Sequence, residues 1–244
     1  TMASFKHAGL FAVAHDGALL VTGGSSVRRL STDGVVTTWR ANIPNPLDEP
    51  MQRPLDEAYK AGITVAPDGT VYLPRFDRLV RRTADGLMRT VAGRNQPSEP
   101  MPKGMPKAFN HVAVDRDGYA YVVDTAGHRL YRASPGGYVE PWAGDGTAGF
   151  VDGPALQARF MYPKAIVASP TGFLYVFDED FPAGRVRRVS PDGVVTTLAG
   201  AGTSTALDGP GNQLAFEDIS GLAWSPAGHL LLAHHKSAKN HKPL

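Results

Sequence analysis

The sequence predicts an all-β protein whose four-stranded antiparallel sheets, or blades, are arranged as a β-propeller. Three observations support this: one hairpin phrase occurs five times, a second follows it four times, and an alanine–aromatic pair opens every repeat. Fixed-period self-similarity is the signature of repeat architectures, in which each unit buries its apolar face against its neighbours. A chain of 244 residues is long enough for one such domain.

The first phrase places short runs of Val, Ile, Leu and Tyr on both sides of a turn that ends in glycine. It covers residues 10–21, 63–73, 112–123, 166–177 and 222–233. Its glycines recur at intervals of about 50 residues and are Gly17, Gly69, Gly118, Gly172 and Gly228. Glycine supplies the positive φ that a tight hairpin turn needs, so each phrase predicts two antiparallel strands.

The second phrase repeats this hairpin chemistry in the first four units. Its turn glycines are Gly34, Gly86, Gly137 and Gly193. Two hairpins give four strands, a to d, whereas the fifth unit supplies only the a–b hairpin. The sequence therefore predicts four full repeats and a partial fifth. We favour five blades, with an incomplete six-bladed ring as the alternative.

The alanine–aromatic pair stands just before the first strand of each repeat. The pairs are Ala3/Phe5, Ala58/Tyr59, Ala108/Phe109, Ala158/Phe160 and Ala215/Phe216. One aromatic ring at a fixed place in each repeat predicts a packing wedge buried between blades. The repeats lie near residues 3–57, 58–107, 108–157, 158–214 and 215–233. Residues 1–233 are then one propeller domain, and 234–244 form a polar, basic tail.

Composition narrows the function classes. The 27 glycines and 20 prolines disfavour helices, and a net charge of +2 argues against nucleic acid as a partner. The chain has no cysteine, which excludes disulfides and thiolate chemistry. No apolar run approaches the length of a membrane span. Composition leaves the compartment open, and we favour an extracytoplasmic or secreted location.

Three segments resemble NHL repeats: residues 121–132, 142–163 and 198–216. They share the family's Gly-rich Asp-Gly loop, its Ala-x-Phe segment and its hairpin that ends in an aspartate. The third and fourth repeats match most closely, and the resemblance covers almost the whole chain. It implies a propeller, and NHL propellers usually have six blades. The amidating-lyase branch of the family binds zinc with several channel histidines, a pattern that this sequence does not reproduce.

We expect binding residues at the end of the blades that carries the long connections. The crossovers 41–56, 94–107, 145–157 and 201–214 are long and rich in Gly, Pro, Asn and Asp, whereas the hairpin turns are short. We call this end the loop-rich face, and it also holds the mouth of the central channel. Inner-strand starts and b–c connections place six candidate binding residues there: Asn110, His111, Lys164, Arg75, Asp124 and His128.

Each candidate also has a structural interpretation. Among the candidates, His111 is best suited to bind a metal or to act as a general base. We nevertheless favour the interpretation that it is an ordinary histidine at the channel rim. Asp124 and Asp178 can accept backbone N–H groups of their own loops. Three adjacent acids at 178–180 could hold calcium, although a solvated loop is favoured. Arginines recur on strand c in a role that every blade needs, pairing with turn aspartates or covering apolar surface: Arg29, Arg82, Arg132 and Arg188.

The sequence therefore predicts a non-enzymatic binding module. Its partner would be a protein, peptide or glycan on the loop-rich face, with no cofactor. The alternative is a channel-mouth, metal-assisted lactonase or lyase of the NHL and gluconolactonase-like type, with one divalent cation, Ca²⁺ or Zn²⁺. A third interpretation is a structural module of a larger extracellular or toxin-like protein.

Overall fold

The computed structural model describes residues 11–14, 16–23, 26–40, 62–75, 78–93, 104–180, 183–200, 211, 216, 219–225 and 227–234. Within these ranges the chain is all-β and contains no α-helix, as predicted. In the same part of the chain, no helix has the length and apolar character needed to span a membrane.

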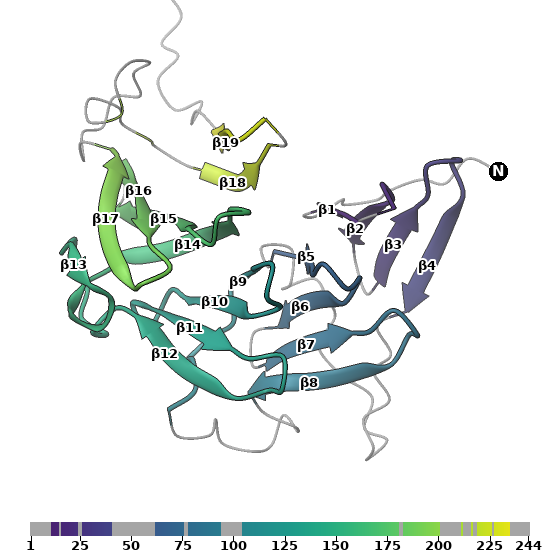
Figure 1. The fold of residues 1–244 in the computed structure, drawn as a ribbon, viewed down its shortest axis with the longest axis horizontal. Coiled ribbons are helices and arrows are strands. Elements are labelled where there is room, and N and C mark those ends of the chain that lie inside the picture. The colour runs from purple at the N-terminus through teal and green to yellow at the C-terminus, as the bar shows by residue number, and fades with distance from the viewer. Residues whose placement is uncertain are drawn as a thin grey trace, which may run out of the picture. The chain divides into compact units, whose positions relative to one another are not determined.

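Successive repeats form separate antiparallel sheets (Figure 1). The first consists of β1 (Phe11–Val13), β2 (Leu19–Gly23), β3 (Ser26–Leu30) and β4 (Val36–Arg40). The second consists of β5 (Thr64–Val65), β6 (Val71–Arg75), β7 (Arg78–Arg82) and β8 (Met88–Gly93). The third consists of β9 (His111–Val114), β10 (Ala120–Asp124), β11 (Arg129–Ala133) and β12 (Val139–Ala143). Each sheet pairs its strands in sequence order, as two consecutive hairpins require.

The fourth sheet has five strands, one more than the first three sheets, whereas the fifth sheet consists of only two strands. The fourth consists of β14 (Tyr162–Ala168), β15 (Leu174–Asp180), β16 (Ala183–Val189) and β17 (Val194–Ala199), with β13 (Gly153–Pro154) added beside β17. The fifth is the hairpin β18 (Ile219–Trp224) and β19 (Leu230–His234). The described strands thus match four full repeats and a partial fifth, while the number of blades in the ring stays a prediction. His234, the first residue of the predicted tail, ends β19.

The hairpin turns combine a left-handed glycine with a side chain that bonds the backbone. Gly118 has a φ of 83°, and Asp115 Oδ1 accepts the N–H groups of Asp117 at 3.0 Å and Tyr119 at 2.9 Å. Only glycine adopts this φ at no steric cost, and the aspartate satisfies N–H groups that the turn leaves unpaired. Local chemistry alone therefore closes each hairpin.

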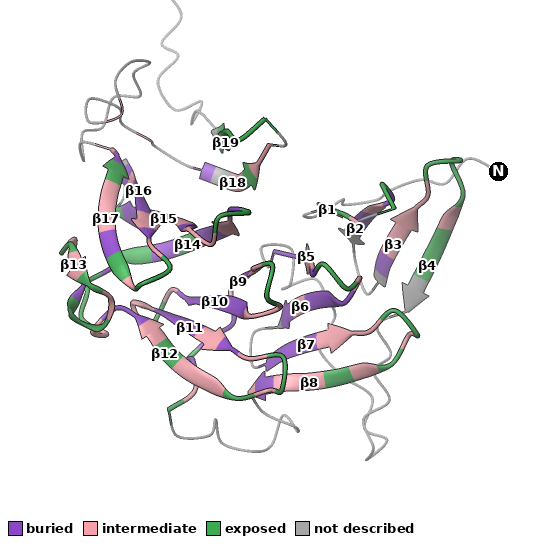
Figure 2. Cartoon of the chain, in the orientation of Figure 1, coloured by how far each residue is buried: buried purple, intermediate pink, exposed green. Residues whose placement is uncertain are grey.

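The chain divides into two compact units. The first comprises residues 1–122 and 132–140, and the second comprises 123–131 and 141–244. A core cluster of the first unit joins Tyr72 and Leu79 to Phe109 and Val122. In the second unit Ala165, Phe177 and Ile219 form a core cluster. Figure 2 shows strand β10 buried and the hairpin turns exposed.

The predicted aromatic wedges are confirmed where the structure describes them. Phe109 is 1% exposed and packs in one cluster with residues of the second and third sheets. Ala158 and Phe160 are both 0% exposed. Phe216 is partly buried against the Ala165 cluster. The pairs Ala3/Phe5 and Ala58/Tyr59 lie outside the described residues.

The crossover 145–157 differs from the prediction in its middle part. It was expected on the loop-rich face, but Gly153 and Pro154 pair with Val195 and Val194 of β17. The N–H of Ala155 then donates to the carbonyl of Gly193 at 2.7 Å, in the c–d hairpin turn. The crossover therefore runs along the outer edge of the fourth sheet to its opposite end. An edge strand has unpaired backbone groups, and β13 satisfies part of them.

Because the Phe160 ring is fully buried, we expect Phe160→Ala to lower the free energy of unfolding by about 3–5 kcal/mol. Chemical denaturation measures this change. Tyr138→Ala is the matched control: this ring is 70% exposed, so its removal should change stability by about 0.5 kcal/mol or less. A loss below about 1 kcal/mol for Phe160→Ala would show that the ring packs against little.

Candidate functional site

The six predicted site residues fall into two groups. Arg75, Asn110 and His111 belong to the first unit, whereas Asp124, His128 and Lys164 belong to the second. Arg75 ends β6, and its side chain lies outside the described residues. Asn110 directly precedes β9, and His111 begins it. In the second unit, His128 forms a hydrogen bond with the carbonyl of Met161, three residues before Lys164.

Asp124 has the structural role expected of it. The residue is 0% exposed, and its Oδ1 accepts the N–H of Gly127 at 3.0 Å. This bond shapes the β10–β11 connection, where His128 adopts a φ of 55°. Non-glycine residues seldom take that conformation. The buried carboxylate therefore holds His128 in position and is not available to a ligand.

Two side chains of the β10–β11 connection bind the backbone of residues 161–163. His128 donates Nδ1–H to the carbonyl of Met161, and Thr125 Oγ1 donates to the carbonyl of Pro163 at 2.6 Å. The imidazole also lies 5.5 Å from the Tyr162 ring, at an interplanar angle of 53°. His128 is thus a positioning residue whose Nε2 remains an acceptor in the neutral ring.

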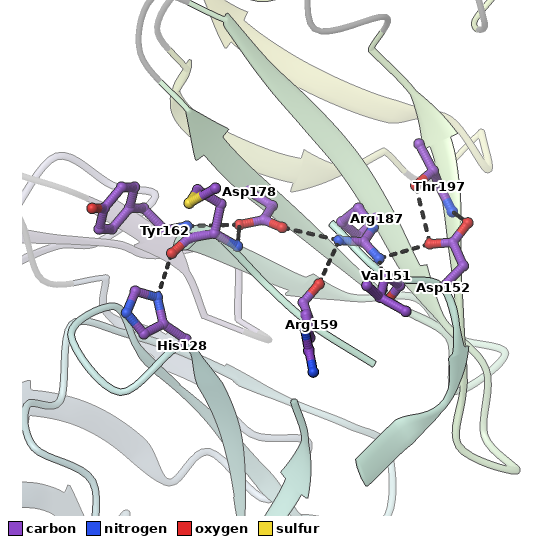
Figure 3. A network of polar contacts seen from close by, with 9 residues as sticks. His128, Val151, Asp152, Arg159, Tyr162, Asp178, Arg187 and Thr197 are labelled. Atoms are coloured by element: carbon purple, nitrogen blue, oxygen red, sulfur yellow. Dashed lines mark hydrogen bonds and ion pairs between the residues drawn. The ribbon is translucent and has the colours of Figure 1, made fainter. Parts of the chain in front are cut away.

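Asp178 holds the same segment from the other side (Figure 3). Its Oδ1 accepts the N–H groups of Met161 and Tyr162, each at 2.9 Å. Its Oδ2 accepts from Arg187 Nη1 at 3.0 Å, and neither side chain is exposed. Burial raises the pKa of Asp178 to about 7, although Arg187 and the two N–H groups oppose that rise.

Arg187 is the centre of the network in Figure 3. Besides Asp178, its guanidinium donates to the carbonyls of Arg159 and Val151 at 3.0 Å each and to Asp152 at 2.6 Å. Asp152 in turn accepts the backbone N–H of Thr197 at 2.9 Å. Arg187 therefore ties the incoming crossover to β15, β16 and β17.

Sequence reasoning singled out Arg188 among the recurrent arginines of strand c and not its neighbour Arg187. Alternation along a strand sends adjacent side chains to opposite faces, so only one of two consecutive arginines can point outward. Arg188 is half-buried and lies 5.2 Å from the Phe173 ring, whereas Arg187 is fully buried. Arg29 pairs with the turn residue Asp16, as expected for the recurrent arginines.

The acids at 178–180 do not form a solvated loop, which corrects the prediction. All three lie in β15, where Asp178 and Glu179 are buried and Asp180 is exposed. Asp178 bonds Arg187, while Glu179 pairs with Lys164. The carboxylates diverge because they alternate along a strand. Among the described residues, no group of three or more His, Asp or Glu side chains lies close enough to hold a metal ion.

Lys164 lies at an irregularity of the sheet. Tyr162 pairs with Glu179 and Pro163 with Asp178, but the register then shifts, so that Ala165 pairs with Phe177 and Lys164 is the additional residue. Such a β-bulge re-aims a side chain. Lys164 and Tyr162 are exposed, and Glu179 is buried beside them. We call His128, Tyr162, Lys164 and Glu179 the β14 patch.

His111 has a different environment. Its Nδ1 is buried and has no hydrogen-bond partner in the described structure. Gly62 approaches the ring so closely that a Cβ there would lie 2.4 Å from it. Burial lowers the pKa of His111 to about 4, so the imidazole is neutral at pH 7. A neutral, half-buried ring with a buried Nδ1 agrees better with a packing role than with a metal ligand or general base.

Comparison with known proteins supports the fold. No protein-family model matches the sequence. A structural genomics protein of unknown function from Bacteroides thetaiotaomicron has a TM-score of 0.68 at 18% identity, covering 93% of this chain and 56% of that one. An auxiliary nutrient binding protein from Bacteroides ovatus has a TM-score of 0.66 at 17% identity, covering 95% and 57%. The chain therefore spans just over half the length of these structures.

The structural neighbours are β-propeller-like proteins of the NHL and gluconolactonase type. At these identities the likeness shows the fold alone, and the chain is an all-β propeller protein. In sequence, the chain is 27% identical to Teneurin-m of Drosophila melanogaster over an alignment of 159 positions, which covers 57% of this chain and 5% of Teneurin-m.

Removing Arg187 tests the network. We expect Arg187→Met to lower the free energy of unfolding by about 3–5 kcal/mol, because it leaves the Asp178 carboxyl buried without its cation. Removal of the cation raises the pKa of Asp178 further above its value in the unfolded chain, so the folded variant keeps its proton to a higher pH than the parent does. The loss of unfolding free energy should therefore be larger at pH 8 than at pH 5. Denaturation at both pH values measures it, and Arg188→Met is the control. Equal losses at the two pH values would contradict the assignment.

His111 should make stability depend on pH in the opposite direction. Its folded pKa of about 4 lies below the unfolded value of 6.5, so the unfolded state binds more protons between these values. The contribution of His111 to the free energy of unfolding should therefore fall as the pH drops from about 6.5 to about 4, by up to about 3 kcal/mol. Because buried Asp178 contributes the opposite slope over the same range, the test compares variants: the His111→Gln variant should lose this fall relative to the parent, whereas the His229→Gln variant, which changes an exposed histidine, should keep it. Identical slopes would mean that His111 titrates normally.

Proposed function

We propose that this chain is an NHL-type repeat propeller that acts as a binding module through its loop-rich face. The polar residues at the start of β14 carry the proposal. Tyr162 and Lys164 are exposed, yet side chains of two other elements fix the backbone beneath them. Rigid presentation of exposed side chains is what a binding surface needs, because it lowers the entropy that binding costs.

The β16–β17 turn, at the opposite end of the fourth sheet, presents fewer side chains that could bind a ligand. There, Ser190 and the exposed Asp192 and Val194 surround Gly193, and the serine is occupied by bonds within the turn. The nutrient binding protein among the neighbours is consistent with a binding role for this scaffold. These observations support a binding role for the loop-rich end of the fourth sheet. For Asn110, in the first unit, the same role is proposed from its place directly before β9.

The metal-assisted lactonase or lyase remains the competing proposal and is separable by experiment. A specific cation stabilises the folded state by mass action, so a thermal shift with Ca²⁺ or Zn²⁺ would favour that class. Binding without a metal effect favours the module.

We expect substitutions on the loop-rich face to weaken binding. Asn110→Ala and Lys164→Ala, made separately, should each weaken binding of hits from a combined glycan array and peptide library by about tenfold. The exposed turn variant Asp117→Ala is the matched control and should bind as the parent does. Loss of binding in Asp117→Ala, with both other variants unaffected, would move the site to the turn end of the sheets.

A further inference from the structure

We propose that the β14 patch is a subsite for a neutral carbohydrate, with Tyr162 as the stacking platform and Lys164 and Glu179 as the hydroxyl-binding pair. This inference rests on the proposed binding function and names the class of ligand. Three features of the patch support it: the balanced charge of its ion pair, the exposed ring of Tyr162, and a backbone whose N–H and C=O groups already form hydrogen bonds.

The charge of the patch is balanced. Lys164 and Glu179 form an ion pair, with 43% of the lysine and 12% of the glutamate side chain exposed. A phosphate or carboxylate ligand would meet the carboxylate of Glu179, and a cation would meet the ammonium of Lys164. Sugar hydroxyls both donate and accept hydrogen bonds, so they can bind to each member of such a pair.

The Tyr162 ring lies beside this pair. Tyr162 is 45% exposed and is the direct register partner of Glu179. Residues directly opposite each other in antiparallel strands project to the same face of the sheet. The ring contacts His128, whose Nδ1 is bound to the Met161 carbonyl, so the ring has a fixed neighbour on one side. An aromatic ring with an apolar face and a polar tip suits the mixed C–H and hydroxyl surface of a sugar.

The backbone of the patch disfavours an extended peptide. A peptide that adds to a sheet edge needs free N–H and C=O groups. Here the N–H groups of Met161 and Tyr162 bind Asp178, and the carbonyls of Met161 and Pro163 bind His128 and Thr125. Pro163 has no N–H of its own. Recognition at this place therefore falls to side chains, which can bind sugar hydroxyls without any free backbone group.

The bulge suggests how the specificity would vary between repeats. The fifth sheet has the same register shift, with Ser220 as the additional residue between Ile219 and Gly221. Lys164 and Ser220 each stand eight positions before the turn glycine of their hairpin, a place that Asn110 occupies in the third repeat. The side chain at this position therefore differs between repeats, because Gly9 and Ala61 stand there in the first two.

The test uses affinity gel electrophoresis of the chain in gels containing amylopectin, xyloglucan, galactomannan or laminarin. We expect retardation by at least one of these neutral polysaccharides. Tyr162→Ala should then weaken binding by about tenfold, Glu179→Gln should weaken it less, and Tyr162→Phe should retain it because the ring remains. Tyr138→Ala, at another exposed tyrosine, should bind as the parent does. Melting curves show whether each variant is folded, and Tyr162→Phe and Glu179→Gln keep the test valid if Tyr162→Ala unfolds.

Other outcomes separate this inference from the proposed function. Retardation that survives Tyr162→Ala and Glu179→Gln would overturn the subsite. Binding to polygalacturonate or heparin alone, or to library peptides alone with loss in Asn110→Ala, would overturn the neutral carbohydrate while the binding module stands. If no polysaccharide and no peptide binds, both proposals fail.

Discussion

The fourth repeat depends on one buried guanidinium. Arg187 has no exposed surface, so each of its N–H groups must find an acceptor inside the protein or incur the cost of an unmet hydrogen bond. It takes acceptors from the crossover (Val151 and Asp152), from Arg159 just after the crossover, and from the neighbouring strand (Asp178). The guanidinium favours the observed path of the crossover, because another path would remove the acceptors at Val151 and Asp152 and leave buried N–H groups without partners.

The effect of that charge extends to the surface of the sheet. Asp178 bonds Arg187 with one oxygen and the backbone of Met161 and Tyr162 with the other. The position of the Tyr162 backbone thus depends on a residue that never meets solvent. Buried polar networks that are satisfied at most of their atoms give rigidity of this kind. The exposed patch and the buried pair belong to one arrangement, and selection on either would constrain the other.

Local chemistry made the hairpins and wedges predictable from the sequence. A glycine at a left-handed turn position and an aromatic residue at a fixed place in each repeat need no knowledge of distant partners, and Phe109 and Phe160 are buried as expected. The role of Asp124 was also predictable, since the partner of its carboxylate is three residues away. Features set by long-range pairing were not: Arg187 bonds residues 28 to 36 positions earlier in the chain. The bulge at Lys164 likewise depends on the register of two strands, which a pattern of alternating residues does not contain.

The placement of β13 has a consequence for how the protein behaves at high concentration. The outermost strand of an antiparallel sheet is a template on which a strand of another molecule can add, and such additions begin aggregation. In the fourth sheet, Gly153 and Pro154 occupy part of that template on β17, and Pro154 has no N–H with which to extend the pairing outward. The connection between two repeats thereby also protects the edge of the sheet from pairing with a strand of another molecule. This double use gives a physical reason for a Gly-Pro dipeptide in the middle of a long crossover.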